Sequence, residues 1–174
     1  LLFKERGTLA TALLLLFAGT LRAETTIKFA TLAPEGSTWM KVMHETAQEI
    51  DDKTHGAVKF RFYAGGVSGD ERDVVRKIRI GQLHAAGFTG LGLGMIAPAV
   101  RIVDSPFLIS STAEADLLTS KFEPEFAKLF EANGYVLLGW AEVGLVYLFT
   151  DKPVRTVEEL RATKMWVWEG DPVA

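Results

Sequence analysis

Two kinds of apolar periodicity take turns along this 174-residue chain. Segments in which polar and apolar residues alternate, as in strands, are separated by segments with apolar residues at steps of three and four, as in helices. The strand pattern covers residues 26–31, 58–63, 83–89, 100–103, 135–150 and 164–168. The helix pattern covers residues 38–54, 70–81, 112–132 and 156–160. Strands that alternate with helices predict an α/β fold with a largely parallel sheet.

Capping residues mark the ends of several predicted helices. Ser37 is a good N-cap for the first helix, and Gly56 suits the left-handed conformation that follows a helix end. Ser68 or Asp70 is suited to cap the second helix. In the third helix we expect a break at Pro124, because the residue before a proline avoids helical geometry.

A hydrophobic leader opens the chain. Lys4 and Arg6 form a short basic segment, residues 9–21 are an almost unbroken apolar run, and Ala23 is a small residue at the expected cut. This order is typical of a secretory signal peptide, and the run is shorter than the ~20 apolar residues that cross a bilayer. We therefore expect residues 1–23 to be a signal peptide and the protein to work in the periplasm. Leu21 stands where a small residue is usual, so an uncleaved anchor is the alternative.

The chain contains no cysteine and carries a net charge of −3 at pH 7. An exported domain without disulfides depends on the burial of apolar surface, and residues 24–174 are numerous enough to form such a core. The leader is basic, so the rest of the chain is more acidic than the whole. Nucleic-acid-binding domains need clustered Lys and Arg, and this acidity therefore argues against nucleic acid as a partner.

Signals for catalysis, metal binding and cofactor binding are weak. Gly90, Gly92 and Gly94 follow a predicted strand, but their spacing departs from the G-x-G-x-x-G of dinucleotide-binding loops. The three histidines have no partners at metal-ligand spacing, and no G-x-S-x-G marks a nucleophile. Asp51 and Asp52 point apart on a helix, as solvated residues do. We expect no cofactor, no metal and no enzymatic activity.

Four segments of the chain are similar to segments of one protein family. They are A-P-E-G-S-T-W-M at residues 33–40, G-G-V-S-G-D-E-R-D-V-V-R-K-I at 65–78, A-P-A-V-R-I-V-D-S-P-F-L at 97–108 and V-E-E-L-R-A-T-K-M-W-V-W at 157–168. In order and spacing they resemble the DctP-type periplasmic solute receptors of tripartite ATP-independent (TRAP) transporters. The resemblance covers residues 26–174.

This resemblance implies a periplasmic-binding-protein fold (type II-like), with two α/β lobes around a cleft and a long strand crossing between them. It implies hinged closure on a small organic solute, by family norm an organic acid, and delivery of that solute to a TRAP permease in the membrane. The alternatives are a receptor that reports its ligand to a signalling partner and an exported enzyme on the same fold.

The same resemblance divides the chain into a signal peptide and parts of two lobes. Residues 24–140 correspond to the first lobe, and residues 141–174 to the crossing strand and the beginning of the second lobe. The chain starts without methionine, ends just after a predicted helix entry at Asp171, and is shorter than family members. We therefore expect a truncated receptor, with most of the second lobe outside the sequence.

One position departs from the family pattern. The resemblance implies an arginine that holds the ligand's carboxylate in the strand after the short helix, and Trp166 occupies that position here. Arginine offers a charged bidentate fork, whereas an indole offers an apolar face and one N–H donor. We therefore expect the receptor to prefer aromatic or neutral solutes, or solutes recognised through other groups, over simple monocarboxylates.

Seven residues are candidate contacts with the solute: Trp39, Phe88, Thr89, Trp140, Trp166, Trp168 and Glu169. The first follows the first strand, and the next two end the third strand, at the carboxyl edge where open α/β sheets bind ligands. Trp140 lies on the predicted crossing strand. For Trp39, the alternative is a surface helix residue packed on a neighbour.

The last three candidates lie together near the end of the chain. Trp166 and Trp168 share one face of their predicted strand at a period of two, which suits an aromatic wall. The alternative for this pair is ordinary core packing. Glu169 follows them and is placed to meet a cationic group on the solute.

Overall fold

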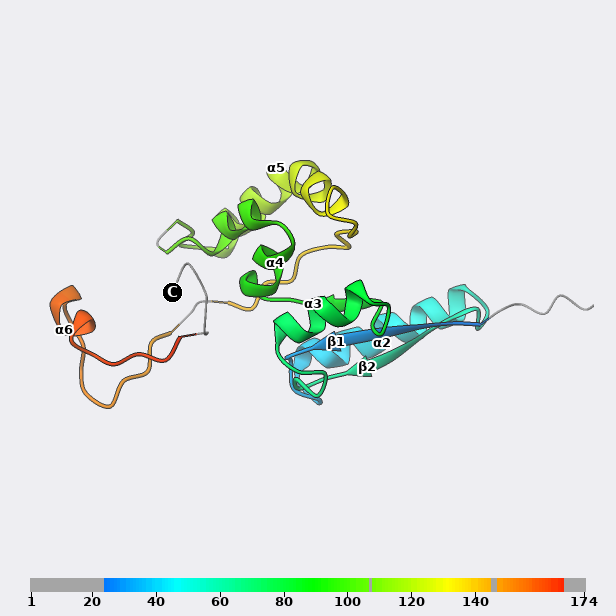
Figure 1. The fold of residues 1–174 in the computed structure, drawn as a ribbon, viewed down its shortest axis with the longest axis horizontal. Coiled ribbons are helices and arrows are strands. Elements are labelled where there is room, and N and C mark those ends of the chain that lie inside the picture. Colours follow the sequence, from blue (N-terminus) through cyan, green and yellow to red (C-terminus); the bar gives the residue numbers. More distant parts are fainter. Residues whose placement is uncertain (1–23, 107, 145–146, 168–174) are drawn as a thin grey trace, which may run out of the picture. The chain divides into compact units, whose positions relative to one another are not determined.

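The structure is a computed structural model that describes residues 24–106, 108–144 and 147–167. The chain separates into two compact units, with the boundary between Gly87 and Phe88 (Figure 1). The predicted signal peptide, Trp168 and Glu169 lie outside the described residues. Within the described ranges, no helix has the length and apolar character needed to cross a membrane.

A three-stranded parallel sheet organises the first unit, in the order β2-β1-β3. Its elements are β1 (Thr25–Thr31), α2 (Thr38–Lys53), β2 (Val58–Tyr63), α3 (Glu71–Arg79) and β3 (Ala85–Gly87). The chain moves from β1 to β2 in one direction and from β2 to β3 in the other. Right-handed crossovers therefore place α2 and α3 on opposite faces of the sheet (Figure 1). The predicted β-α-β-α-β order is confirmed here.

Local chemistry sets the ends of α2 as the sequence predicts. The hydroxyl of Ser37 accepts a hydrogen bond from the Met40 amide at 3.3 Å. This bond satisfies one of the first-turn N–H groups that have no acceptor within the helix. Beyond the other end, Gly56 adopts φ +79°, a value that costs glycine little. The second helix is capped by Asp70, whose carboxylate accepts from the Asp73 amide at 2.9 Å.

Apolar side chains on the two faces of the sheet form the core of the first unit. On the α2 face, the Phe29 ring lies 6.0 Å from the Trp39 ring and 5.7 Å from the Phe62 ring. Met40 is fully buried, and Val75 of α3 is 2 % exposed. Burial of each large apolar side chain contributes about 1.5–3 kcal/mol, so these contacts hold both helices to the strands.

The second unit is helical where it has regular structure among the described residues. It contains α4 (Gly90–Ile96), the 3₁₀ helix η1 (Pro98–Asp104), α5 (Thr112–Glu131) and α6 (Val157–Arg161). The strand expected at residues 100–103 is therefore wrong. Pro98 at the start of η1 suits a helical first turn, and Val100 is fully buried against its surroundings. A short apolar run does not by itself distinguish a strand from a buried helix.

The third predicted helix, α5, is continuous from Thr112 to Glu131, so the break expected at Pro124 is wrong. A proline inside a helix removes one hydrogen bond and costs about 3 kcal/mol. Phe126 and Phe130, beyond the proline, are 5 % and 3 % exposed. Their burial gives the helix a reason to continue, and α5 packs against η1.

Two further strand predictions fail. The described residues of 135–150 and the stretch 164–167 belong to no strand. The third strand is also shorter than the expected 83–89, because only Ala85–Gly87 pair with β1. A strand needs a neighbour for its backbone hydrogen bonds, and apolar, β-branched composition does not supply one.

Candidate functional site

Two loops meet at the carboxyl edge of the first unit's sheet. The Gly65 amide donates to the Ala33 carbonyl at 2.8 Å, and the Gly66 amide donates to the Thr31 carbonyl at 3.1 Å. Gly65 and Gly66 have backbone φ values of +64° and +75°, which residues with a Cβ atom rarely adopt. The loops after β1 and β2 are therefore held together by backbone bonds at the edge where α/β sheets bind ligands.

Trp39 lies at this same edge. A Cβ built on Gly87, the last residue of β3, would lie 3.0 Å from Cη2 of the Trp39 indole, so the ring covers the end of that strand. The side chain is half-buried and contacts the Phe29 ring. This position agrees with the predicted placement of Trp39, and it shows packing on a neighbour as well. Its role in binding stays a prediction.

Phe88 and Thr89 open the second unit. Thr89 is the N-cap residue of α4 and is exposed, whereas Phe88 is half-buried. They follow β3 directly, as expected, and the alternate glycines after them lie in the helix α4.

A pair of side chains from η1 explains two of these glycines. Arg101 and Asp104 form an ion pair of 3.2 Å, with side chains 14 % and 35 % exposed. A Cβ on Gly90 would lie 1.2 Å from the Asp104 carboxylate, and a Cβ on Gly94 would lie 2.4 Å from Cδ of Arg101. The ion pair therefore rests on a strip of α4 that has no side chains. The spacings 90/94 and 101/104 were the available sequence signal, but the glycines were compared only with dinucleotide-binding loops, and a strand was predicted at 100–103.

Trp140 packs against α5. Its ring lies 5.4 Å from the Phe126 ring in an edge-on arrangement. The indole Nε1 is shielded from solvent and has no hydrogen-bond acceptor among the described residues. A shielded indole N–H normally has an acceptor, so the Trp140 N–H can still donate one hydrogen bond.

Of the candidates near the chain end, only Trp166 lies in a described range, and it is 74 % exposed. The expected aromatic wall with Trp168 stays a prediction. Across the described ranges, no group of three or more His, Cys, Asp or Glu side chains is placed to hold a metal ion.

A parallel α/β unit with its loops joined at the carboxyl edge defines a class of ligand-receiving lobes, of the kind found in two-lobed solute receptors. Residues 29–171 match the sequence profile of DctP, described as "Bacterial extracellular solute-binding protein, family 7". The chain belongs to this family.

Two relatives are named as solute-binding proteins. The chain is 29% identical over 133 residues to a solute-binding protein of Chromohalobacter salexigens, a match that covers 75% of this chain and 40% of that protein. It is 28% identical over 163 residues to a solute-binding protein of Sulfitobacter sp. NAS-14.1, covering 91% and 48%. The chain thus spans less than half of the length of these relatives.

Solved structures show the same fold. A TRAP periplasmic solute-binding protein of Pseudomonas putida F1, with bound D-glucuronate, aligns with a TM-score of 0.72 at 24% identity, over 78% of this chain and 45% of that one. A TRAP periplasmic solute-binding protein of Chromohalobacter salexigens, also with D-glucuronate, aligns with a TM-score of 0.61 at 25% identity, over 66% and 38%. The α/β, periplasmic-binding-protein-like fold is confirmed.

Proposed function

We propose that this chain is part of an extracytoplasmic receptor that binds a small organic acid and delivers it to a TRAP-type permease. The observation that carries the proposal is the family match over residues 29–171. The solute would lie at the carboxyl edge of the sheet, and hinged closure would follow from its higher affinity for the closed form. Such a receptor binds and releases its solute without catalysis.

The class of solute is supported by a related structure. The Chromohalobacter salexigens protein, at 25% identity, holds D-glucuronate, a sugar acid. A sugar acid presents hydroxyl groups beside its carboxylate, and the Trp140 indole N–H has no acceptor among the described residues. We therefore assign the Trp140 indole N–H a hydrogen bond to an oxygen of the solute.

Calorimetric titration of the natural gene product, purified from the periplasmic fraction, tests this function. Titration with D-glucuronate, D-galacturonate and D-erythronate should give saturable binding for at least one acid, and titration with D-glucose, the neutral counterpart of D-glucuronate, should give none. Mass spectrometry of the same sample should find the solute unchanged after incubation. Conversion of the solute would favour an enzyme, and tight binding of glucose alone would refute the acid class.

One substitution tests the role of the Trp140 N–H. Trp140→Phe keeps an aromatic ring against Phe126 and removes the N–H donor together with part of the ring area, and it should weaken binding of the acid about tenfold. Phe122→Leu, on the exposed side of α5, is the matched control and should leave the affinity unchanged. Equal affinities for the wild type and Trp140→Phe would exclude Trp140 from the site.

A further inference from the structure

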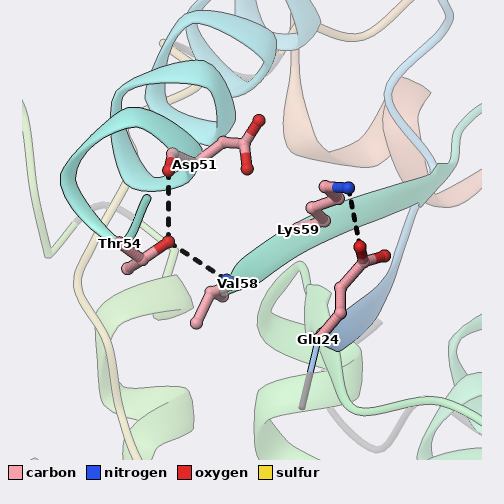
Figure 2. A network of polar contacts seen from close by, with 5 residues as sticks. All are labelled: Glu24, Asp51, Thr54, Val58 and Lys59. Carbon is pink, nitrogen blue, oxygen red and sulfur yellow. Dashed lines mark hydrogen bonds and ion pairs between the residues drawn. The ribbon is translucent and has the colours of Figure 1, made fainter. Parts of the chain in front are cut away.

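A groove lies in the first unit, between α2 and the outer strand β2. It has a volume of about 390 Å³ and is open to solvent. Its lining includes Glu35, His44, Asp51, Lys59, Phe60 and Phe62. The hydroxyl of Thr54 ties its two walls together, because it donates to the Asp51 carbonyl at 3.3 Å and accepts from the Val58 amide at 3.0 Å (Figure 2).

Asp51 brings a carboxylate oxygen without a hydrogen-bond donor to this groove. Figure 2 shows its carboxylate on the side of α2 that faces β2. The Oδ1 atom is shielded from solvent and has no hydrogen-bond partner among the described residues. A shielded carboxylate oxygen without a donor costs free energy, more than a neutral group would. The groove therefore favours a ligand that donates hydrogen bonds.

The position of Asp51 in α2 adds to this preference. The helix ends at Lys53, so Asp51 lies in its last turn, where the partial charge of the helix is negative. A carboxylate there is repelled by the helix end, and a cation is attracted. Both effects favour a positively charged donor next to Asp51.

The charged groups around Asp51 already have partners of their own. Lys59 makes an ion pair of 2.7 Å with Glu24, and this hydrogen bond, followed by the attraction between the two charges and a smaller attraction to Asp51, raises the pKa of Lys59 (Figure 2). His44 pairs with Glu35 at 2.9 Å. The carboxylates of Glu24, Glu35 and Asp51 thus exceed the fixed positive charge nearby.

The floor of the groove is aromatic. Phe60 and Phe62 lie on one face of β2 with their rings 5.8 Å apart and nearly parallel, and the His44 ring meets Phe62 edge-on at 4.8 Å. The face of an aromatic ring attracts cations, and its area also buries apolar groups.

We propose that this groove binds a small organic ammonium ion, whose N–H groups donate to the Asp51 carboxylate and whose apolar part lies on Phe60 and Phe62. The ammonium position is beside Asp51 in the last turn of α2, whereas Glu35 at the other end of the groove belongs to the loop after β1. This binding is independent of the proposed transport function. The affinity is modest, on the order of millimolar, because the groove is open and the ligand small.

The probe for the test is 2-phenylethylammonium, with 2-phenylethanol as its neutral counterpart. Saturation-transfer NMR and calorimetry on the full chain should show saturable binding of the amine and at least tenfold weaker binding of the alcohol. Asp51→Asn keeps the shape of the side chain and should weaken amine binding about tenfold. Asp52→Asn is the matched control, because Asp52 lies one residue on and accepts instead from Gln48 at 3.0 Å.

Three results would overturn the proposal. The first is no saturable binding of the amine, and the second is equal binding of amine and alcohol. The third is amine binding that appears only in Lys59→Met, since the Lys59 ammonium would then satisfy Asp51 in the wild type. Circular dichroism of each variant confirms that it folds. Phe60→Leu keeps the charges and removes a ring, so it should weaken the binding of the amine and of the alcohol alike.

Discussion

Phe29 and Trp140 both lie in segments with the composition of a strand, yet only Phe29 is part of a sheet. Phe29 is 6 % exposed and pairs in register with Phe62 on one side and Ala85 on the other. Trp140 lies in a stretch without regular secondary structure and with no strand beside it in the described part of the chain, and Val136 and Leu138 near it are 75% and 82% exposed.

The two regions differ in whether a strand is available to pair with them. In the first unit, β2 pairs with β1 after one helix, and β3 pairs with β1 after α2, β2 and α3, so every strand has a partner within the unit. In the second unit, α4 and η1 are held by side chains that pack on glycines. Strand propensity is therefore informative only where a neighbouring strand is available.

The core of the first unit offers the largest expected effect. Met40→Ala removes a fully buried side chain and should lower the free energy of unfolding by about 3 kcal/mol. Val42→Ala, on the 53%-exposed side of the same helix, should change it by less than about 0.5 kcal/mol. Urea unfolding followed by circular dichroism measures both. Similar losses for the two variants would mean that α2 is not anchored through Met40.

The glycine strip tests the second unit in the same way. Gly90→Ala would bring a Cβ to 1.2 Å from Asp104 and should cost about 2 kcal/mol, because the carboxylate has to leave its place beside Arg101. Gly139→Ala meets no atom within 4 Å and is the control. Adding Asp104→Ala to Gly90→Ala should recover part of the loss. A Gly90→Ala protein as stable as Gly139→Ala would show that α4 and η1 are packed loosely.

Helix caps should matter less in the second unit than in the first. Ser37→Ala should cost about 1 kcal/mol of global stability, because α2 is part of a buried core. Thr156 caps α6 through a capping box, but α6 buries no residue. Thr156→Ala should therefore increase local amide exchange in α6 without a measurable change in global unfolding. Hydrogen exchange followed by NMR distinguishes a loss of global stability from local opening of α6. Equal losses of global stability in Ser37→Ala and Thr156→Ala would contradict the expected difference between the two units.

The smallest effect is expected at the start of β1. Glu24→Gln should return the raised pKa of Lys59 toward its ordinary value of 10.5. Because folding raises this pKa, the ion pair contributes stability below about pH 10 and loses it as the pH rises through the folded value. An NMR titration of Lys59 checks the shift, with Glu45→Gln as the control. An unchanged pKa in Glu24→Gln would mean that Glu24 does not hold the ammonium in solution.

The sequence predicted part of the candidate site and missed the rest. Trp39 and Phe88 follow their strands as expected, because the end of a strand is a local property of the chain. No sequence pattern predicts the contact of Trp140 with Phe126. The same holds for the Asp51 oxygen that has no hydrogen-bond donor among the described residues. Asp51 looked like a solvated surface acid, since its burial depends on β2 and not on α2 alone.

The sequence by itself determined the β-α-β-α-β order of the first unit, both ends of α2 and the family of the chain. Periodicity, caps and turn glycines act within a few residues of each other, so they can be recognised without the fold. Only the tertiary structure decided that Gly90–Ile96 is a helix, that α5 runs through Pro124 and that residues 135–144 lack a strand partner. These outcomes depend on contacts between segments distant in sequence, such as Asp104 on Gly90, and such contacts can outweigh local propensity.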